Sequence, residues 1–338
     1  MAKRALVVSG GGAKGAFAVG AVQHLIQDLN ISFDIVCGTS TGALMAPLIV
    51  ADAIDDLVHL YTSLHTNDVV LRREVLSILK SDSVYNVQPL MDRVSDAITN
   101  ARAASVLNSP RQMFLATVCL QTGRPTYFYS GPPAEPPTGS DLVRLEDRDS
   151  LILAMMGSAD MPALMPPIQV FPGSRPVRQY VDGGVRERAP LEVALANGAT
   201  EIYAVILAPK EHSPVEKKFT DVEGILLRTI GAFTEDVLLH DLLVVESVVQ
   251  GRRYFQEVKG RIQSRFELTD EDIARLFSDD THTRNALIGP SVDLIVIRPD
   301  AELAIDTLTF DPGLMARLVE TGRERAVLAM ANRREWLA

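Results

Sequence analysis

Short apolar runs alternate with longer stretches of mixed polarity along the chain, and glycines mark many of the junctions. Almost continuously apolar runs are typical of strands that are buried on both faces of a sheet. Runs of this kind predict strands at residues 4–9, 33–37, 112–119, 201–207 and 293–297. Helices are expected between them at 16–29 and 43–50. Strand, glycine turn and helix in alternation predict an α/β fold, with a mostly parallel sheet sandwiched by helices.

The remaining stretches predict more helices, one hairpin and one exposed loop. Further helices are expected at residues 52–107, 149–157, 190–197, 220–280 and 312–336. Residues 112–119 and 124–130 are expected to form a hairpin, and the proline-rich residues 131–139 an exposed loop. A short strand at 179–181 is expected to end at Asp182-Gly183-Gly184.

No change in composition marks a domain boundary in the chain. Residues 1–338 are therefore expected to form one domain, with a helical elaboration at residues 208–290. The amphipathic run from Ile225 to Val249 fits a lid or interfacial element, and it equally fits a helix packed on the sheet. The sequence leaves both alternatives open.

The charge balance excludes several classes of partner. The 338 residues carry a formal net charge of −10 without a basic run, which argues against nucleic acid and against electrostatic adsorption to anionic membranes. No apolar stretch reaches the ~18 residues of a membrane-spanning helix, and no signal peptide is recognised. Cys37 and Cys119 lie in predicted buried strands, as free thiols in a reducing compartment do. We therefore expect a cytoplasmic protein, free or peripheral to membranes.

The stretch Gly38-Thr39-Ser40-Thr41-Gly42 joins a predicted strand to a predicted helix. A sharp strand-to-helix turn pushes its apex residue outward in a strained conformation, and Gly38 and Gly42 would leave room for it. The N-terminus of the helix would point amide groups and partial positive charge at Ser40. This context favours a nucleophilic serine. The alternative is an ordinary glycine-rich turn that carries a serine.

A second glycine turn, Gly10 to Gly15, matches G-x-G-x-x-G between a strand and a helix. The carboxylate that would bind a ribose about 20 residues further on is missing, and Lys14 precedes Gly15 rather than following it as in a P-loop. Gly10, Gly11 and Gly12 can instead aim amide groups at one point, as the oxyanion of an attacked ester requires. Lys14 would add positive charge there or be a solvated lysine.

A serine nucleophile needs a base. His212, His240 and His282 follow it in the chain, but none stands in a turn directly after a predicted strand, and His212 comes nearest. Asp182 ends a short strand, and Gly183 and Gly184 would let its carboxylate approach the serine closely. In a dry site an aspartate with a short hydrogen bond to Ser40 suffices as the base. An ordinary Asp-Gly-Gly turn is the alternative. No spacing of histidines, cysteines and carboxylates suggests a metal site.

The three turns resemble, in kind and in order, the motifs of the patatin-like phospholipases, and the likeness extends over about residues 4–207. It implies a three-layer fold related to that of the α/β hydrolases and a Ser–Asp dyad without histidine, with Ser40 as nucleophile and Asp182 as base. It makes the amides of Gly10, Gly11 and Gly12 the oxyanion hole and implies no metal or organic cofactor. The supporting motif residues are Lys14, Gly15, Gly38, Gly42, Gly183 and Gly184. Ser9 departs from the pattern, since some members have aspartate there.

The resemblance implies a lipid acyl-ester hydrolase of the phospholipase A or lysophospholipase type, which meets its substrate at a membrane or micelle surface and uses no nucleotide. A thioesterase or protein deacylase with the same dyad is the nearest alternative. A nucleotide-binding module using Gly10 to Gly15 and a non-catalytic acyl-binding protein are more distant ones. An apolar, adaptable stretch from Leu151 to Ile168 would line a groove for the acyl chain, with core packing as the alternative. Its candidate residues are Met155, Met156, Met161, Leu164 and Met165. The sequence leaves the lipid class, the acyl-chain length and the oligomeric state open.

Overall fold

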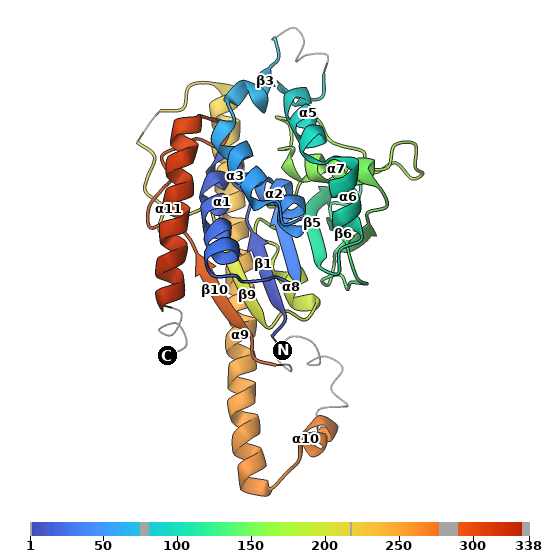
Figure 1. Cartoon of the computed structure of the whole chain (residues 1–338), viewed down its shortest axis with the longest axis vertical. Coiled ribbons are helices and arrows are strands. Elements are labelled where there is room, and N and C mark those ends of the chain that lie inside the picture. Colours follow the sequence, from blue (N-terminus) through green and yellow to red (C-terminus); the bar gives the residue numbers. More distant parts are fainter. Residues whose placement is uncertain (1, 75–80, 217, 277–289, 333–338) are drawn as a thin grey trace.

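The computed structural model describes residues 2–74, 81–216, 218–276 and 290–332. Its centre is an eight-stranded sheet in the order β10-β9-β1-β2-β5-β6-β7, with β8 paired to β5 beside that path (Figure 1). The strands of this sheet are β1 (Arg4–Val8), β2 (Ile35–Thr39), β5 (Gln112–Cys119), β6 (Pro125–Ser130), β7 (Asp141–Arg144), β8 (Tyr180–Asp182), β9 (Glu201–Val205) and β10 (Asp293–Ile297). A separate antiparallel ribbon joins β3 (Leu71–Arg72) to β4 (Tyr85–Asn86).

Neighbouring strands from β10 to β5 run parallel, whereas β6 runs antiparallel to β5. This mixed, mostly parallel sheet confirms the predicted fold class. The pairing of β5 with β6 is the predicted hairpin. Strand β7, which pairs in parallel with β6, was not predicted. It is four residues long, and none of its side chains is buried, so it carries no apolar run that could have signalled a strand.

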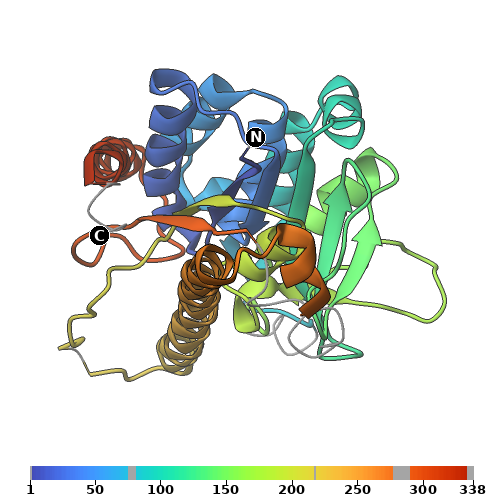
Figure 2. The ribbon, with the colours of Figure 1, turned by 90° about the horizontal axis from the view of Figure 1, so that it is seen from below.

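Helices cover both faces of the sheet and make three layers (Figure 2). The first face is covered by α1 (Gly15–Gln23), α2 (Thr41–Val50), α3 (Ile54–Ser63), α5 (Gln88–Ala97), α6 (Asn100–Leu107), α7 (Arg148–Ala159) and α11 (Pro312–Ala331). The second face is covered by α8 (Leu191–Ala196) and α9 (Val222–Phe266). Successive side chains of β1 point to opposite faces of the sheet. Leu6 and Val8 pack in the core of the first face, and Ala5 and Val7 pack in the core of the second.

Residues 52–107 are less helical than predicted, because the β3–β4 ribbon interrupts them and residues 75–80 lie outside the described part. The stretch predicted as a helix at 220–280 divides at Glu267, whose left-handed backbone ends α9. The short helix α10 (Asp270–Leu276) follows. Residues 277–280 of that prediction, and 333–336 of the predicted closing helix, lie outside the described residues.

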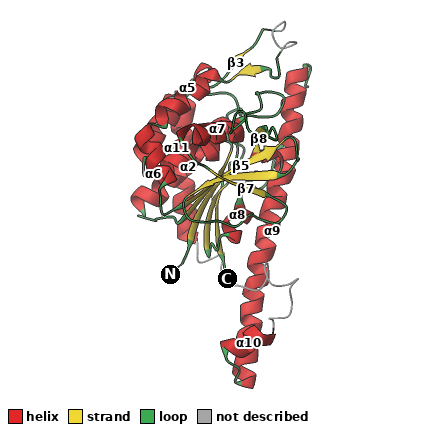
Figure 3. Ribbon diagram, turned by 90° about the vertical axis from the view of Figure 1, so that its right-hand side faces the viewer, coloured by secondary structure: helices red, strands yellow, loops and turns green. Residues whose placement is uncertain are grey.

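Helix α9 is 45 residues long and packs on the sheet through its middle. Leu238, Leu242 and Val245 are buried in the core of the second face. The helix then continues beyond the body of the molecule, where α10 lies at its far end (Figure 3). Of the two alternatives for the run from Ile225 to Val249, the structure therefore supports the helix packed on the sheet. None of the described helices is long and apolar enough to cross a membrane.

Strand β5 sets the register that brings two distant chain segments together. Thr39, the last residue of β2, pairs with Ala116 of β5, and the next β5 residue, Thr117, pairs with Asp182 at the end of β8. Because β6 occupies the other edge of β5, β8 must lie on the same edge as β2 and run in the opposite direction. The ends of β2 and β8 therefore meet head to head, which places the residue after Thr39 beside Asp182.

Candidate active site

Ser40 stands at the sharp turn between β2 and α2, with φ 57° and ψ −121°. A residue with a Cβ rarely adopts such a conformation, and its presence at a strand-to-helix turn is the strained apex that the sequence predicts. The turn is closed by two glycines. A Cβ on Gly38 would lie 2.2 Å from the carbonyl oxygen of Gly42, and a Cβ on Gly42 would lie 2.3 Å from that of Val8.

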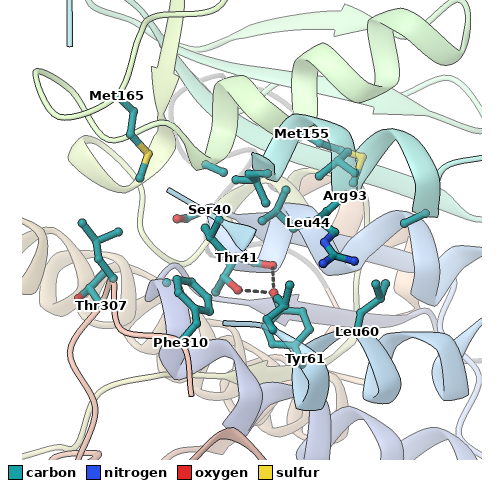
Figure 4. Close-up of a pocket in the computed structure, with 18 of the residues that line it drawn as sticks. Ser40, Thr41, Leu44, Leu60, Tyr61, Arg93, Met155, Met165, Thr307 and Phe310 are labelled. Carbon is teal, nitrogen blue, oxygen red and sulfur yellow. Dashed lines mark hydrogen bonds between the residues drawn. The ribbon is translucent and has the colours of Figure 1, made fainter. Parts of the chain in front are cut away.

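Two hydroxyl groups hold the backbone around Ser40. The buried Ser158 of α7 accepts a hydrogen bond from the Ser40 amide at 3.0 Å and donates one to the Ala116 carbonyl at 2.6 Å. On the other side, the Tyr61 hydroxyl donates to the Thr41 carbonyl at 3.4 Å and lies 2.5 Å from the Thr41 hydroxyl (Figure 4). The sequence does not assign a role to Ser158 or Tyr61, because each is a single polar residue in an ordinary helical pattern.

Asp182 is buried beside Ser40. Its Oδ1 accepts a hydrogen bond from the Gly184 amide at 2.7 Å, while Gly183 packs so closely that a Cβ would lie 2.5 Å from the Ala116 carbonyl. Burial raises the pKa of Asp182 to about 6. The Gly184 amide, the neighbouring Ser40 side chain and the charge of Arg188 oppose that rise. The structure thus brings the predicted serine and carboxylate together.

The glycine turn after β1 contributes fewer free amides than predicted. The Gly10 amide already donates to the carbonyl of Arg188 at 3.0 Å, which removes it from the predicted set of oxyanion donors. Within the described part of the chain, the amides of Gly11 and Gly12 donate no hydrogen bond. Gly12 has a φ of +56°, and a Cβ there would lie 2.2 Å from the Thr307 carbonyl. It also lines the same cavity as Ser40.

Lys14 and His212 both contact Glu302 rather than Ser40. The Lys14 ammonium lies 3.5 Å from one carboxylate oxygen of Glu302, and His212 Nδ1 lies 2.6 Å from the other. Lys14 is therefore neutralised locally. Gly15 lets α1 begin against the start of α2, because a Cβ there would lie 2.3 Å from the Thr41 hydroxyl.

None of the described histidines lines the cavity that contains Ser40. His240 is exposed on α9, and His282 lies outside the described residues. The described residues also hold no group of three or more His, Cys, Asp or Glu side chains that could bind a metal ion. Among the described residues, the base that the structure places beside Ser40 is therefore Asp182 rather than a histidine.

The cavity beside Ser40 is lined mainly by apolar side chains (Figure 4). Its volume is about 100 Å³, and it is partly open to solvent. The side chains that line it include Leu44, Leu48, Leu57, Leu60, Leu64, Leu90, Val94, Met155, Met161, Met165, Leu308 and Phe310. Of the residues predicted for an acyl groove, Met155, Met161 and Met165 line this cavity. Met156 and Leu164 belong to the buried core instead.

Asp160, at the end of α7, is a second buried carboxyl next to Asp182. Its side chain is inaccessible to solvent, and neither oxygen has a hydrogen-bond partner among the described residues. Its carbonyl accepts the Asp182 amide at 2.9 Å. Burial, with a smaller contribution from the charge of Asp182, raises the pKa of Asp160 to about 8. Asp160 is therefore a neutral acid at neutral pH.

A family model matches more than half of the chain. Residues 6–195, which include all three glycine turns, match the family model described as patatin-like phospholipase. A similar solved structure is titled "Crystal structure of VipD from Legionella pneumophila". It is 13% identical with a TM-score of 0.47, and the alignment covers 98% of this chain and 67% of that chain. A search of the curated proteins found no match.

The buried Asp160 predicts a pH-dependent cost to stability. Its pKa is about 8 in the folded chain and about 4 when unfolded, so between these values only the folded state holds the proton. The free energy of unfolding of the wild type then falls as pH rises, by about 1.4 kcal/mol per pH unit from this group. The Asp160→Asn variant lacks that decline.

Urea unfolding of both proteins at several pH values between about 5 and 8 measures the difference in slope. Asp149→Asn, at an exposed carboxylate of the same helix, is the matched control and keeps the wild-type slope. Equal slopes for the wild type and Asp160→Asn would contradict a protonated Asp160 in the folded chain.

Proposed function

The chain belongs to the patatin-like phospholipase family, whose members are lipid acyl hydrolases, and we propose that it cleaves phospholipid or lysophospholipid esters through a Ser40–Asp182 dyad. The family match confirms the resemblance to patatin-like phospholipases that the three glycine turns indicated. The observation that carries the proposal is the register of β5, which places Ser40, at the end of β2, beside the buried carboxyl of Asp182 at the end of β8. An apolar cavity opens at the same serine, as a lipid substrate requires.

In the first half-reaction, Ser40 Oγ attacks the ester carbonyl carbon while Asp182 accepts the hydroxyl proton. The carbonyl π electrons move to the oxygen, and the amides of Gly11 and Gly12 donate hydrogen bonds to the resulting oxyanion. One such donor lowers a barrier by roughly 2.7–4 kcal/mol. When the tetrahedral intermediate collapses, the carbon–oxygen bond to the alcohol breaks. The leaving oxygen takes the proton from Asp182, and the acyl group remains on Ser40.

In the second half-reaction, Asp182 accepts a proton from water, whose oxygen attacks the acyl carbon. Collapse of the second intermediate returns the proton to Ser40 Oγ and releases the fatty acid. Burial makes Asp182 a stronger base than a solvated aspartate, since its pKa is raised to about 6. The carboxylate stays ionised at neutral pH, so it is ready to act as the base.

The cavity is suited to the acyl chain of the substrate. Ser40 and Gly12 line the same cavity as leucines and methionines, so a carbonyl carbon at Ser40 leaves its hydrocarbon tail among apolar side chains. Methionine side chains adapt to flexible chains at small cost. We infer that the acyl group, rather than the headgroup, occupies this cavity.

Substitution of either dyad residue should abolish hydrolysis of a p-nitrophenyl acyl ester. Ser40→Ala removes the nucleophile and Asp182→Asn removes the base, and losses of about 10³–10⁶-fold in kcat are expected from comparable catalytic groups. A fluorophosphonate probe should label Ser40 in the wild type.

In the wild type, kcat/KM should rise as pH increases through about 6, because Asp182 must lose its proton before it can act as the base.

Full activity in a folded Ser40→Ala or Asp182→Asn variant would overturn the dyad. The Asp149→Asn variant serves again as the control. A panel of phospholipid, lysophospholipid, triacylglycerol and acyl-CoA distinguishes the proposed substrate from that of a thioesterase, for which acyl-CoA would be hydrolysed fastest.

A bulky side chain at the far end of the cavity should shorten the accepted acyl chain. Leu60 lines the cavity away from Ser40 (Figure 4), and Leu60→Trp would fill space that a long chain needs. We expect kcat/KM for a long-chain ester to fall by roughly 10–100-fold relative to a short-chain ester, as for other hydrophobic pockets. Leu29→Trp, at an exposed leucine outside the cavity, should leave that ratio unchanged. An unchanged ratio in Leu60→Trp would place the acyl chain elsewhere.

A further inference from the structure

A short segment after the Asp-Gly-Gly turn contacts both other glycine turns. This segment, Glu187 to Ala189, is called the 187–189 strap. It begins one residue after the helical turn Gly183–Val185, and the Glu187 amide donates to the Gly183 carbonyl at 2.8 Å. The strap is thus fixed at its start to the turn that carries Asp182.

The strap is hydrogen-bonded to the residues next to the proposed nucleophile and oxyanion donors. The Thr39 hydroxyl, one residue before Ser40, donates to the Glu187 carbonyl at 3.1 Å. Gly10, one residue before Gly11, is bonded twice to Arg188. The Gly10 amide donates to the Arg188 carbonyl at 3.0 Å, and Arg188 Nε donates to the Gly10 carbonyl at 3.2 Å.

Helix α9 holds the strap from the other side. Asp241 Oδ2 accepts the amides of both Arg188 and Ala189, each at 2.8 Å. The Asp241 side chain is buried between α9 and the sheet, beside Leu238 and Leu242. Burial raises the pKa of Asp241 to about 7, and the two amide bonds oppose that rise. A buried carboxylate with two fixed donors is a rigid anchor, because release would leave it desolvated and unpaired.

The guanidinium of Arg188 is directed to the glycine turn rather than to a carboxylate. Among the described residues, no acidic side chain lies within ion-pair distance of it. Its charge nevertheless acts on Asp182, whose pKa it lowers. Arg188 therefore affects two turns at once, through a bond to Gly10 and through its charge at Asp182.

We propose that Arg188 and Asp241 are positioning residues, which hold the 187–189 strap so that Ser40 and the amides of Gly11 and Gly12 keep their relative places. The inference rests on the proposed function of those groups. It gives α9 a role in the reaction, as the support of the oxyanion turn. Misplacing a catalytic group by about 1 Å costs on the order of 10²-fold in rate.

The test compares variants of the full chain in hydrolysis of a short-chain p-nitrophenyl ester. Asp241→Ala removes both acceptor bonds, and we expect kcat to fall about 10²-fold with little change in KM, because transition-state contacts are lost rather than substrate binding. Asp241→Asn keeps an oxygen that can accept both amides and should restore most of the rate. Arg188→Met keeps a similar side-chain length but removes the Nε donor to the Gly10 carbonyl, and it should also lower kcat.

Controls on the same segments separate positioning from general damage. Asp236→Ala on α9 and Arg186→Met before the strap change exposed charges, and both should keep the wild-type kcat. Circular dichroism reports whether each variant is folded. If Asp241→Ala is not folded, the rate of Arg188→Met decides.

Labelling of Ser40 by a fluorophosphonate is measured in parallel, because the phosphonyl oxygen of the probe is expected to bind the amides of Gly11 and Gly12. Slower labelling of folded Arg188→Met and Asp241→Ala, with rescue by Asp241→Asn, is the expected result. Wild-type labelling rates and kcat in both folded variants would overturn the inference and leave the dyad intact. No labelling of Ser40 in the wild type would instead overturn the proposed function.

Discussion

The structure depends on one constraint, which is that β2 and β8 share a single edge of β5. They approach from opposite directions and stop at adjacent β5 residues, Ala116 and Thr117. Each strand ends in a turn with a closely packed glycine, so Ser40 and Asp182 are brought together by main-chain pairing. Backbone hydrogen bonds in the middle of a sheet are costly to break. The site is therefore as rigid as the sheet that carries it.

Burial governs the chemistry of the carboxyl groups around this junction. Desolvation is the largest influence on the pKa of Asp182, Asp160 and Asp241, and it raises all three. The three groups differ in the hydrogen bonds that oppose this rise in pKa. The carboxyl groups of Asp182 and Asp241 accept amide hydrogen bonds, whereas that of Asp160 has no hydrogen-bond partner among the described residues and has the highest pKa of the three. Desolvation makes Asp182 a better base, and it makes Asp160 lower the free energy of unfolding as pH rises.

The local parts of this site could be predicted from the sequence, and the parts that depend on tertiary contacts could not. Gly38, Ser40 and Gly42 lie within five residues, so steric rules for one turn were enough to predict the apex conformation. The loss of Gly10 as a donor could not be foreseen, because its partner is Arg188, far away in the sequence. Asp241 looks like any polar residue on an amphipathic helix, and only the packing of α9 reveals its two amide partners.

The central claim is that two distant turns converge on one hydroxyl, and a crystal structure of the fluorophosphonate adduct tests it most directly. We predict a phosphorus atom on Ser40 Oγ, with its oxygen within ~2.7–3.1 Å of the Gly11 and Gly12 amide nitrogens. We also predict that the Asp182 carboxylate lies beside Ser40 Oγ. A phosphonyl oxygen bound away from those amides, or a histidine in the place of Asp182, would contradict this claim.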